Sequence, residues 1–203
     1  MAERSINPAR CSVRIVGGSR RGRKISAPRG RDLRPTSERA REALFNILQH
    51  RDLPAAPLAG ATIMDLFAGT GALGLEALSR GAGELYAIER DREALKHLRH
   101  NVHELDFDDE VTVIEGDATW FRKPGITEHR CDYAFLDPPY GENLVARTLR
   151  ALAESDWLAD QAVVIVEMGR QDEFAPPDEY AVLEDRRYGS ARIVLLGWSA
   201  PKF

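Results

Sequence analysis

From Thr62 onward, short apolar runs alternate with longer stretches of helical periodicity, and this alternation constrains the possible folds more than any other feature of the chain. The apolar runs predict strands over residues 63–67, 84–88, 111–114, 133–136 and 162–166. The stretches between them predict helices over 72–80, 92–104 and 144–154. This order favours an α/β fold in which a parallel sheet carries helices on both faces. Two last runs, 180–187 and 191–198, flank a tight turn and predict an antiparallel hairpin that closes the sheet.

A glycine-rich stretch, DLFAGTGALG, ends the first predicted strand and opens the first predicted helix. Gly69, Gly71 and Gly74 fit the pattern GxGxxG, whose glycines allow a tight turn and a close approach of the backbone to a ligand at a helix N-terminus. A dinucleotide-binding site has the same glycines and an acid about 20 residues further on, which Glu89 supplies. The glycines alone therefore leave the cofactor class open.

Asp65 distinguishes between the cofactor classes. It stands before the first glycine, where dinucleotide fingerprints carry apolar residues, and its carboxylate suits an ammonium-bearing ligand better than a pyrophosphate. S-adenosylmethionine carries both an ammonium and a carboxylate, which an acid beside exposed backbone N–H groups complements. Glu89 can accept from both ribose hydroxyls, whereas Asp117 either accepts from the adenine amino group or caps a helix. We expect a cofactor site that includes Asp65, Phe67, Gly69, Gly71, Glu89 and Asp117.

The tetrapeptide Asp137-Pro138-Pro139-Tyr140 follows the strand predicted over 133–136. Because open α/β sheets bind ligands beyond the carboxyl ends of their strands, it should face the same crevice as the glycine loop. The prolines favour a rigid turn with an unpaired Pro138 carbonyl, which together with Asp137 can hold one –NH₂ group. Asp137 can also stabilise positive charge on the attacking nitrogen, and Tyr140 can stack on the base. We therefore expect methyl transfer to an exocyclic amine of an unpaired base, with Asp137, Pro138 and Tyr140 as catalytic residues.

The first 41 residues are strongly basic, although the whole chain has a net charge of only −4. They hold 12 Lys and Arg against 3 acidic residues, whereas the remainder holds 16 basic and 29 acidic residues. Within VRIVGGSRRGRKI, apolar residues flank a glycine-containing turn, which predicts a hairpin. Such a hairpin would present a cationic surface to a phosphate backbone through Arg20, Arg21, Arg23 and Lys24.

A helix is predicted after this hairpin, from a cap at Thr36 to about residue 49. Its apolar face should dock on the main domain, leaving Arg39 and Arg41 near solvent or substrate. The Pro- and Ala-rich segment 50–60 marks a connection. We therefore divide the chain into an N-terminal extension, residues 1–53, and a catalytic domain, residues 54–203.

Across nearly its whole length, the chain resembles the RsmD-type bacterial 16S rRNA guanine-N2 methyltransferases. The resemblance rests on VRIVGGSRRGRKI, RPTSERAREALFNIL, DLFAGTGALGLEALSRGA, DPPY and, more loosely, RRYGSARIVLL. It implies a Rossmann-like class I methyltransferase core with a mostly parallel seven-stranded sheet, preceded by a small β-hairpin and helix. It also implies S-adenosylmethionine as donor and, as partner, 16S rRNA in the 30S subunit or a late assembly intermediate. By the same resemblance, Thr36 belongs to the cofactor site and Arg34 to the RNA-binding residues.

The residues around DPPY do not by themselves distinguish guanine N2 from adenine N6 or cytosine N4, so the target atom rests on the resemblance. Two alternatives stay open. One is a DNA adenine-N6 methyltransferase or another amino-methyltransferase on the same fold. The other is a non-catalytic RNA-binding assembly factor.

Several further expectations concern what the chain lacks. No early apolar run resembles a signal peptide, no stretch approaches the ~20 apolar residues that span a bilayer, and the two cysteines lie far apart. We expect a cytoplasmic monomer without a metal, because His97 and His100 have no accompanying set of ligands. Trp120, Trp157 and Trp198 are expected to pack in the core or at an edge rather than to stack on bases.

Overall fold

The computed structural model describes residues 13–28, 37–120, 130–139 and 144–199. Strands β1 (Val13–Arg14) and β2 (Lys24–Ile25) form a small antiparallel sheet, and helix α1 (Glu38–His50) follows. The main sheet contains β3 (Thr62–Asp65), β4 (Glu84–Glu89), β5 (Val111–Glu115), β6 (Cys131–Leu136), β7 (Leu158–Gly169), β8 (Tyr180–Tyr188) and β9 (Ala191–Trp198). The helices after β3, β4 and β6 are α2 (Ala72–Ser79), α3 (Arg92–Glu104) and α4 (Leu144–Ala153).

The strand order in the main sheet is β5-β4-β3-β6-β7-β9-β8. Neighbouring strands from β5 to β7 are parallel, and β9 is antiparallel to β7 and β8. The predicted mostly parallel seven-stranded sheet, closed by an antiparallel hairpin, is thus confirmed. Strand β7 is much longer than the apolar run over 162–166, because Leu158 pairs with Cys131 of β6 and the three residues after the run, 167–169, pair with β9.

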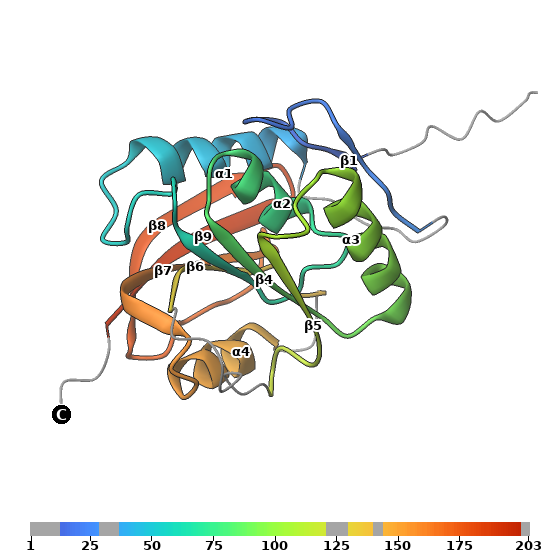
Figure 1. The fold of residues 1–203 in the computed structure, drawn as a ribbon. Helices are drawn as coiled ribbons and strands as arrows, with labels where there is room; N and C mark the ends of the chain where they lie inside the picture. The colour runs from blue at the N-terminus through green and yellow to red at the C-terminus, as the bar shows by residue number, and fades with distance from the viewer. Residues whose placement is uncertain (1–12, 29–36, 121–129, 140–143, 200–203) are drawn as a thin grey trace, which may run out of the picture.

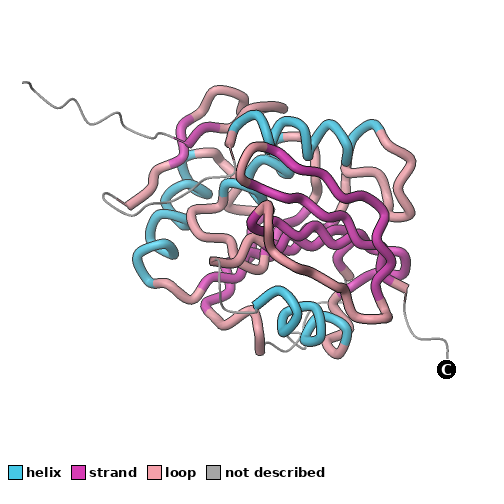
Figure 2. The backbone as a smooth tube through the Cα atoms, turned by 180° about the vertical axis from the view of Figure 1, so that it is seen from behind, coloured by secondary structure: helices cyan, strands magenta, loops and turns pink. Residues whose placement is uncertain are grey.

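The molecule has three layers (Figures 1 and 2). Helices α1, α2 and α3 and the N-terminal hairpin cover one face of the sheet, and α4 covers the other. The first face buries Leu44, Leu75 and Leu98, one from each helix, against the sheet, and Leu149 and Leu152 of α4 pack on the second. No helix in the described ranges is long and apolar enough to cross a membrane.

The N-terminal hairpin and α1 contribute directly to the core under the first face. Val13, Ile15 and Ile25 of the hairpin are buried in the same apolar cluster as Phe45 of α1 and Phe135 of β6. Helix α1 is capped by Ser37, whose hydroxyl accepts from the backbone N–H of Ala40, so the prediction of Thr36 as the cap is wrong. A serine immediately before the first helical turn satisfies a donor that would otherwise lack a partner.

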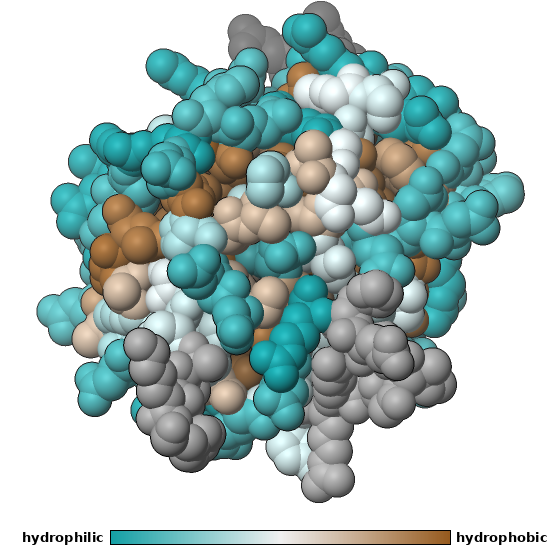
Figure 3. Space-filling model, turned by 60° about the vertical axis from the view of Figure 1, so that its left-hand side comes forward, coloured by the Kyte–Doolittle hydropathy of each residue, from teal (hydrophilic) through white to brown (hydrophobic). Residues whose placement is uncertain are grey.

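On the face of the molecule drawn in Figure 3, hydrophilic side chains surround an apolar region. Figure 3 brings the β8 side toward the viewer and shows apolar side chains gathered in a band across that face. Among the described residues, the large hydrophobic side chains that are exposed are those of Trp120, Val182 and Leu183. Trp157 and Trp198 are buried, as expected, whereas the expectation that Trp120 packs in the core or at an edge is wrong.

Candidate active site

The glycine loop connects the carboxyl end of β3 to the first turn of α2. Gly71 has a φ of +91°, and a Cβ atom there would lie 2.7 Å from the side chains of Leu75 and Leu98. Glycine is therefore required both by the left-handed backbone and by the packing of α2 against α3. The loop is also held at Thr70, whose carbonyl accepts a 2.8 Å hydrogen bond from Nδ2 of Asn101.

Asp65 lies at the end of β3 beneath this loop and is buried. Its Oδ2 accepts from the backbone N–H of Gly74 at 3.1 Å, while Oδ1 has no hydrogen-bond partner among the described residues. Burial, together with the nearby charge of Glu89, raises the pKa of Asp65 to about 7. An unpartnered buried carboxylate oxygen is costly, and a cationic ligand group at the loop would offset that cost.

Glu89 is the last residue of β4, and Asp117 lies two residues after the end of β5. Glu89 Oε2 accepts from the backbone N–H of Gly69 at 2.8 Å, and its Oε1 accepts from the N–H groups of Arg90 and Asp91. Asp117 Oδ1 accepts from the backbone N–H and the hydroxyl of Thr119, both at 2.8 Å, and these bonds lower its pKa. Glu89 therefore supports the glycine loop directly, and Asp117 closes a turn at the exposed end of β5.

Asp137 directly follows β6 and is a neighbour of Glu167 on β7. Leu136 pairs with Val166 in the parallel register, so the residues that follow them, Asp137 and Glu167, lie side by side. Asp65 pairs with Phe135, two residues before Asp137, so all three acids are on the same face of the sheet. Glu167 is buried. Burial, followed by the charges of Glu167 and Asp65, raises the pKa of Asp137 well above its usual value.

Asp65 and Asp137 flank the point where the chain reverses its direction of winding. From β3 the chain continues to β4 and β5 on one side, and then returns to β6 on the other. Open α/β sheets bind ligands at such switch points, beyond the carboxyl ends of the strands. Pro138, which is buried, and the exposed Pro139 extend from β6 at this position.

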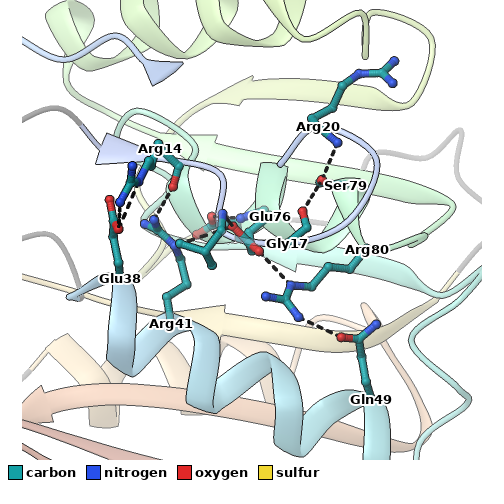
Figure 4. A network of polar contacts seen from close by, with 12 residues as sticks. Arg14, Gly17, Arg20, Glu38, Arg41, Gln49, Glu76, Ser79 and Arg80 are labelled. Atoms are coloured by element: carbon teal, nitrogen blue, oxygen red, sulfur yellow. Dashed lines mark hydrogen bonds and ion pairs between the residues drawn. The ribbon is translucent and has the colours of Figure 1, made fainter. Parts of the chain in front are cut away.

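A buried ionic network joins this region to the N-terminal hairpin (Figure 4). Glu76, in the middle of α2, is fully buried and accepts from Val16 N–H and Arg80 Nε, both at 2.7 Å. Arg41 Nε lies 3.7 Å from the same carboxylate, and its Nη2 donates to the carbonyl of Arg14. Arg41 is fully buried, so its predicted position near solvent or substrate is wrong, because it pairs with a carboxylate that sequence spacing does not reveal.

The tip of the hairpin lies at the opposite end of α2 from the glycine loop. Ser19 N–H donates to the carbonyl of Ser79 at 2.6 Å, and Arg20 N–H donates to the Ser79 hydroxyl at 2.9 Å. Arg20 Nε donates to the carbonyl of Leu105 at 2.7 Å, and Arg23 donates to that of Glu104. These two predicted RNA-binding arginines therefore cap the C-terminal end of α3, where cations are favourable.

The other two predicted basic residues of the hairpin, Arg21 and Lys24, are exposed, as is Arg23. Three predicted site residues, Arg34, Thr36 and Tyr140, lie outside the described residues. The site also contains a residue that sequence analysis missed, Glu167, which a carboxylate within the apolar run AVVIVEMG could have indicated.

The carboxyl edge of the sheet therefore combines a glycine loop with acids at Asp65, Glu89, Asp137 and Glu167. The negative charges of these acids would repel a pyrophosphate, whereas the unpartnered Asp65 oxygen suits the ammonium of S-adenosylmethionine. Glu89 and Asp117 retain lone pairs that can accept from the sugar and base of the same ligand. No group of three or more potential metal ligands occurs among the described residues.

The fold and this edge define a class I, S-adenosylmethionine-dependent methyltransferase. A solved structure of a putative methyltransferase from Escherichia coli is similar to the chain, with a TM-score of 0.78, 34% identity, and coverage of 94% of this chain and 99% of that one.

Residues 13–197 match the family model described as "Conserved hypothetical protein 95". Ribosomal RNA small subunit methyltransferase D of Escherichia coli is 41% identical over 155 residues, which are 76% of this chain and 74% of the relative. The Haemophilus influenzae protein of the same name is 34% identical over 182 residues, with coverage of 89% and 91%. The chain belongs to this family, the RsmD family of rRNA methyltransferases, and the resemblance found in its motifs is confirmed.

Proposed function

We propose that this chain transfers a methyl group from S-adenosylmethionine to the exocyclic N2 amino group of a guanine in 16S rRNA, within the small subunit or a late assembly intermediate. The observation that carries the proposal is the position of Asp65 and Asp137 on the two sides of the switch point. One acid lies beneath the glycine loop, and the other begins the proline turn. The names of the relatives, which are small-subunit rRNA methyltransferases, support the choice of substrate.

S-adenosylmethionine, when bound, supplies a methyl group activated by the sulfonium. Asp65 and the loop N–H groups would hold its methionine portion, and Glu89 its ribose hydroxyls. Asp137 and the Pro138 carbonyl would accept hydrogen bonds from the guanine amino group and orient its lone pair toward the methyl group. Catalysis would then rest mostly on positioning and on the negative charge of Asp137 near the developing cation.

A proton must leave the amino nitrogen once the methyl group is attached. Asp137 is suited to receive it, because its raised pKa makes it a better proton acceptor than an ordinary carboxylate. No strong base is needed before attack, since the nitrogen becomes acidic only as its bond to carbon forms. The target guanine must be unpaired or flipped to reach this turn.

Arg21 and Lys24, two exposed cations of the hairpin, would bind the phosphate backbone away from the reacting base. Because the hairpin tip contacts the last turn of α2, an RNA bound there and at the proline turn would span the length of that helix. This separation favours a folded RNA over a short isolated strand.

The proposal is tested by labelled methyl transfer to undermethylated 30S subunits, free 16S rRNA and duplex DNA in parallel, followed by nucleoside identification. We expect N2-methylguanosine in the rRNA, and loss of transfer in Asp137→Ala with cofactor binding retained. Asp160→Ala, an exposed acid near the amino end of β7, is the matched control. Label only in DNA or protein would reject the proposed substrate, and full turnover in Asp137→Ala would reject the catalytic assignment.

A further inference from the structure

Trp120 is exposed to an unusual degree for the largest aromatic side chain. Its relative exposure is 80%, whereas those of Trp157 and Trp198 are 0% and 7%. The other exposed large hydrophobic residues in the described ranges, Val182 and Leu183, lie on the edge strand β8. Val182 is in register with Leu196 and Val164, in the half of the sheet away from the active site. Trp120 is thus the exposed large hydrophobic residue that lies beside the candidate site.

The backbone around Trp120 forms a fixed turn. The backbone N–H of Trp120 donates to the carbonyl of Asp117 at 3.0 Å, and Asp117 Oδ1 accepts from Thr119. The turn lies beyond the carboxyl end of β5, next to the end of β4, because Gly116 N–H donates to the carbonyl of Glu89. The tryptophan is therefore held at the edge where the candidate cofactor residues gather.

Two exposed arginines on α4 lie near this turn. Arg147 Nη2 donates to the hydroxyl of Thr119 at 3.3 Å, and Arg150 lies one turn further along the exposed face of the helix. The nearby acids Asp117 and Glu115 form ion pairs with Arg90 and Arg92 at 3.7 and 3.8 Å, so these arginines offset the negative charge of the two acids. We call Trp120, Arg147 and Arg150 the α4 rim. It combines an open aromatic face with two exposed arginines.

We propose that the α4 rim is a second RNA-binding surface, on which Trp120 stacks with an unpaired base next to the target guanine while Arg147 and Arg150 contact its phosphates. This inference rests on the proposed function. A base can reach the proline turn only from an unpaired segment, so neighbouring bases are available for stacking. Helix α4 begins a few residues after Pro139, which places the rim at the same entrance. The positive charge favours an RNA strand over an acidic or neutral protein partner.

Tryptophan fluorescence gives a direct test, because Trp120 dominates the fluorescence that solvent quenchers reach. The full-length protein is titrated with unmodified 16S rRNA while acrylamide quenching is measured. We expect RNA to quench and shield Trp120, and Trp120→Phe to remove this change with little loss of affinity. Trp120→Ala should weaken RNA binding by about 5- to 150-fold, the range for losing one stacked base. Affinity for S-adenosylhomocysteine should not change.

Arg147→Ala should weaken RNA binding and reduce its salt dependence by about one phosphate contact. Arg130→Ala, which removes an exposed arginine just before β6 at the opposite edge, is the control and should bind RNA like wild type. The proposal would be overturned if RNA left the acrylamide quenching of Trp120 unchanged, or if Trp120→Ala bound RNA with wild-type affinity. If wild-type protein methylates rRNA and Trp120→Ala does so equally well, only this inference fails. If wild-type protein neither binds nor methylates rRNA, the proposed function fails.

Discussion

The backbone N–H of Val16 donates a 2.7 Å hydrogen bond to Oε2 of Glu76, a fully buried carboxylate in the middle of α2. The bond joins the N-terminal hairpin to the helix that begins at the glycine loop. Arg80 binds the other carboxylate oxygen, and Arg41 approaches the same one as Val16. A single acid therefore fixes the hairpin against the helix that follows the glycine loop.

Removing this acid should destabilise the protein strongly. In Glu76→Ala the buried Arg41 loses its nearest carboxylate and Val16 N–H loses its acceptor, so we expect a loss of about 3–5 kcal/mol. Chemical denaturation measures the change in the free energy of unfolding. Glu93→Ala, which breaks an exposed pair with Lys96, should cost less than about 1 kcal/mol. If both variants lowered the free energy of unfolding by a similar, small amount, Glu76 would not be the residue that anchors the hairpin.

The docking of the hairpin also depends on Gly18. Gly18 and Gly22 both have positive φ, at +77° and +84°, but only at Gly18 would a Cβ meet backbone, 1.7 Å from the carbonyl oxygen of Ser79. Gly22→Ala should therefore cost only about 1–2 kcal/mol of backbone strain. Gly18→Ala should additionally separate the hairpin from α2. Limited proteolysis should cleave the hairpin faster in Gly18→Ala than in Gly22→Ala, and equal rates would contradict this packing.

Cofactor affinity should depend on pH through Asp65, whose pKa is about 7. As the pH falls through this value, the carboxylate takes up a proton and no longer attracts the ligand ammonium. Calorimetric titration with S-adenosylhomocysteine should show weaker binding at pH 6 than at pH 8. Asp65→Asn should bind weakly at both values. If its affinity kept the pH dependence of wild type, another group would be responsible.

The same pKa has a consequence for stability. The folded value lies above the unfolded value of about 4, so the folded state binds the extra proton between these two values. The contribution of Asp65 to the free energy of unfolding is therefore fully present below about pH 4 and is lost as the pH rises through about 7. In Asp65→Asn, this part of the pH dependence should disappear from denaturation curves measured across that range.

Glu167 should set the pH at which Asp137 becomes active. Asp137 is next to Glu167 on β7 and near Asp65 on β3, while Arg41 of α1 acts on Glu167 with the opposite charge. Glu167→Gln removes one negative neighbour and should lower the pKa of Asp137. The acid limb of the kcat profile should then move to lower pH. A uniform loss of kcat at every pH would instead mean a purely structural role.

The four hairpin cations that we predicted to bind RNA should fall into two pairs that differ in their effect on stability. Replacing Arg21 and Lys24 by alanine should weaken RNA binding and lower its salt dependence with little change in the melting temperature, because both are exposed. Replacing Arg20 and Arg23 should also lower the melting temperature, because they bind the carbonyls at the end of α3. Filter binding at several salt concentrations and thermal melting test this. Equal melting losses in both double variants would contradict the division.

The sequence by itself determined the order of the elements and the position of the two motifs. Apolar periodicity and glycine spacing act over a few residues, so the parallel strands, the glycine loop and the proline turn were all predicted from local pattern. The rule that parallel strands bind ligands at their carboxyl ends then placed Asp65 and Asp137 together.

Only the tertiary structure decided which charged residues are buried and what they bind. Arg41 and Arg20 look like surface cations in the sequence, yet one pairs with Glu76 and the other with the carbonyl of Leu105, 85 residues away. Glu167 and Trp120 gained their significance in the same way, from the strand register beside Asp137 and from the turn at the end of β5. The physical reason is that burial and electrostatic pairing depend on distances across the fold, which no local periodicity encodes.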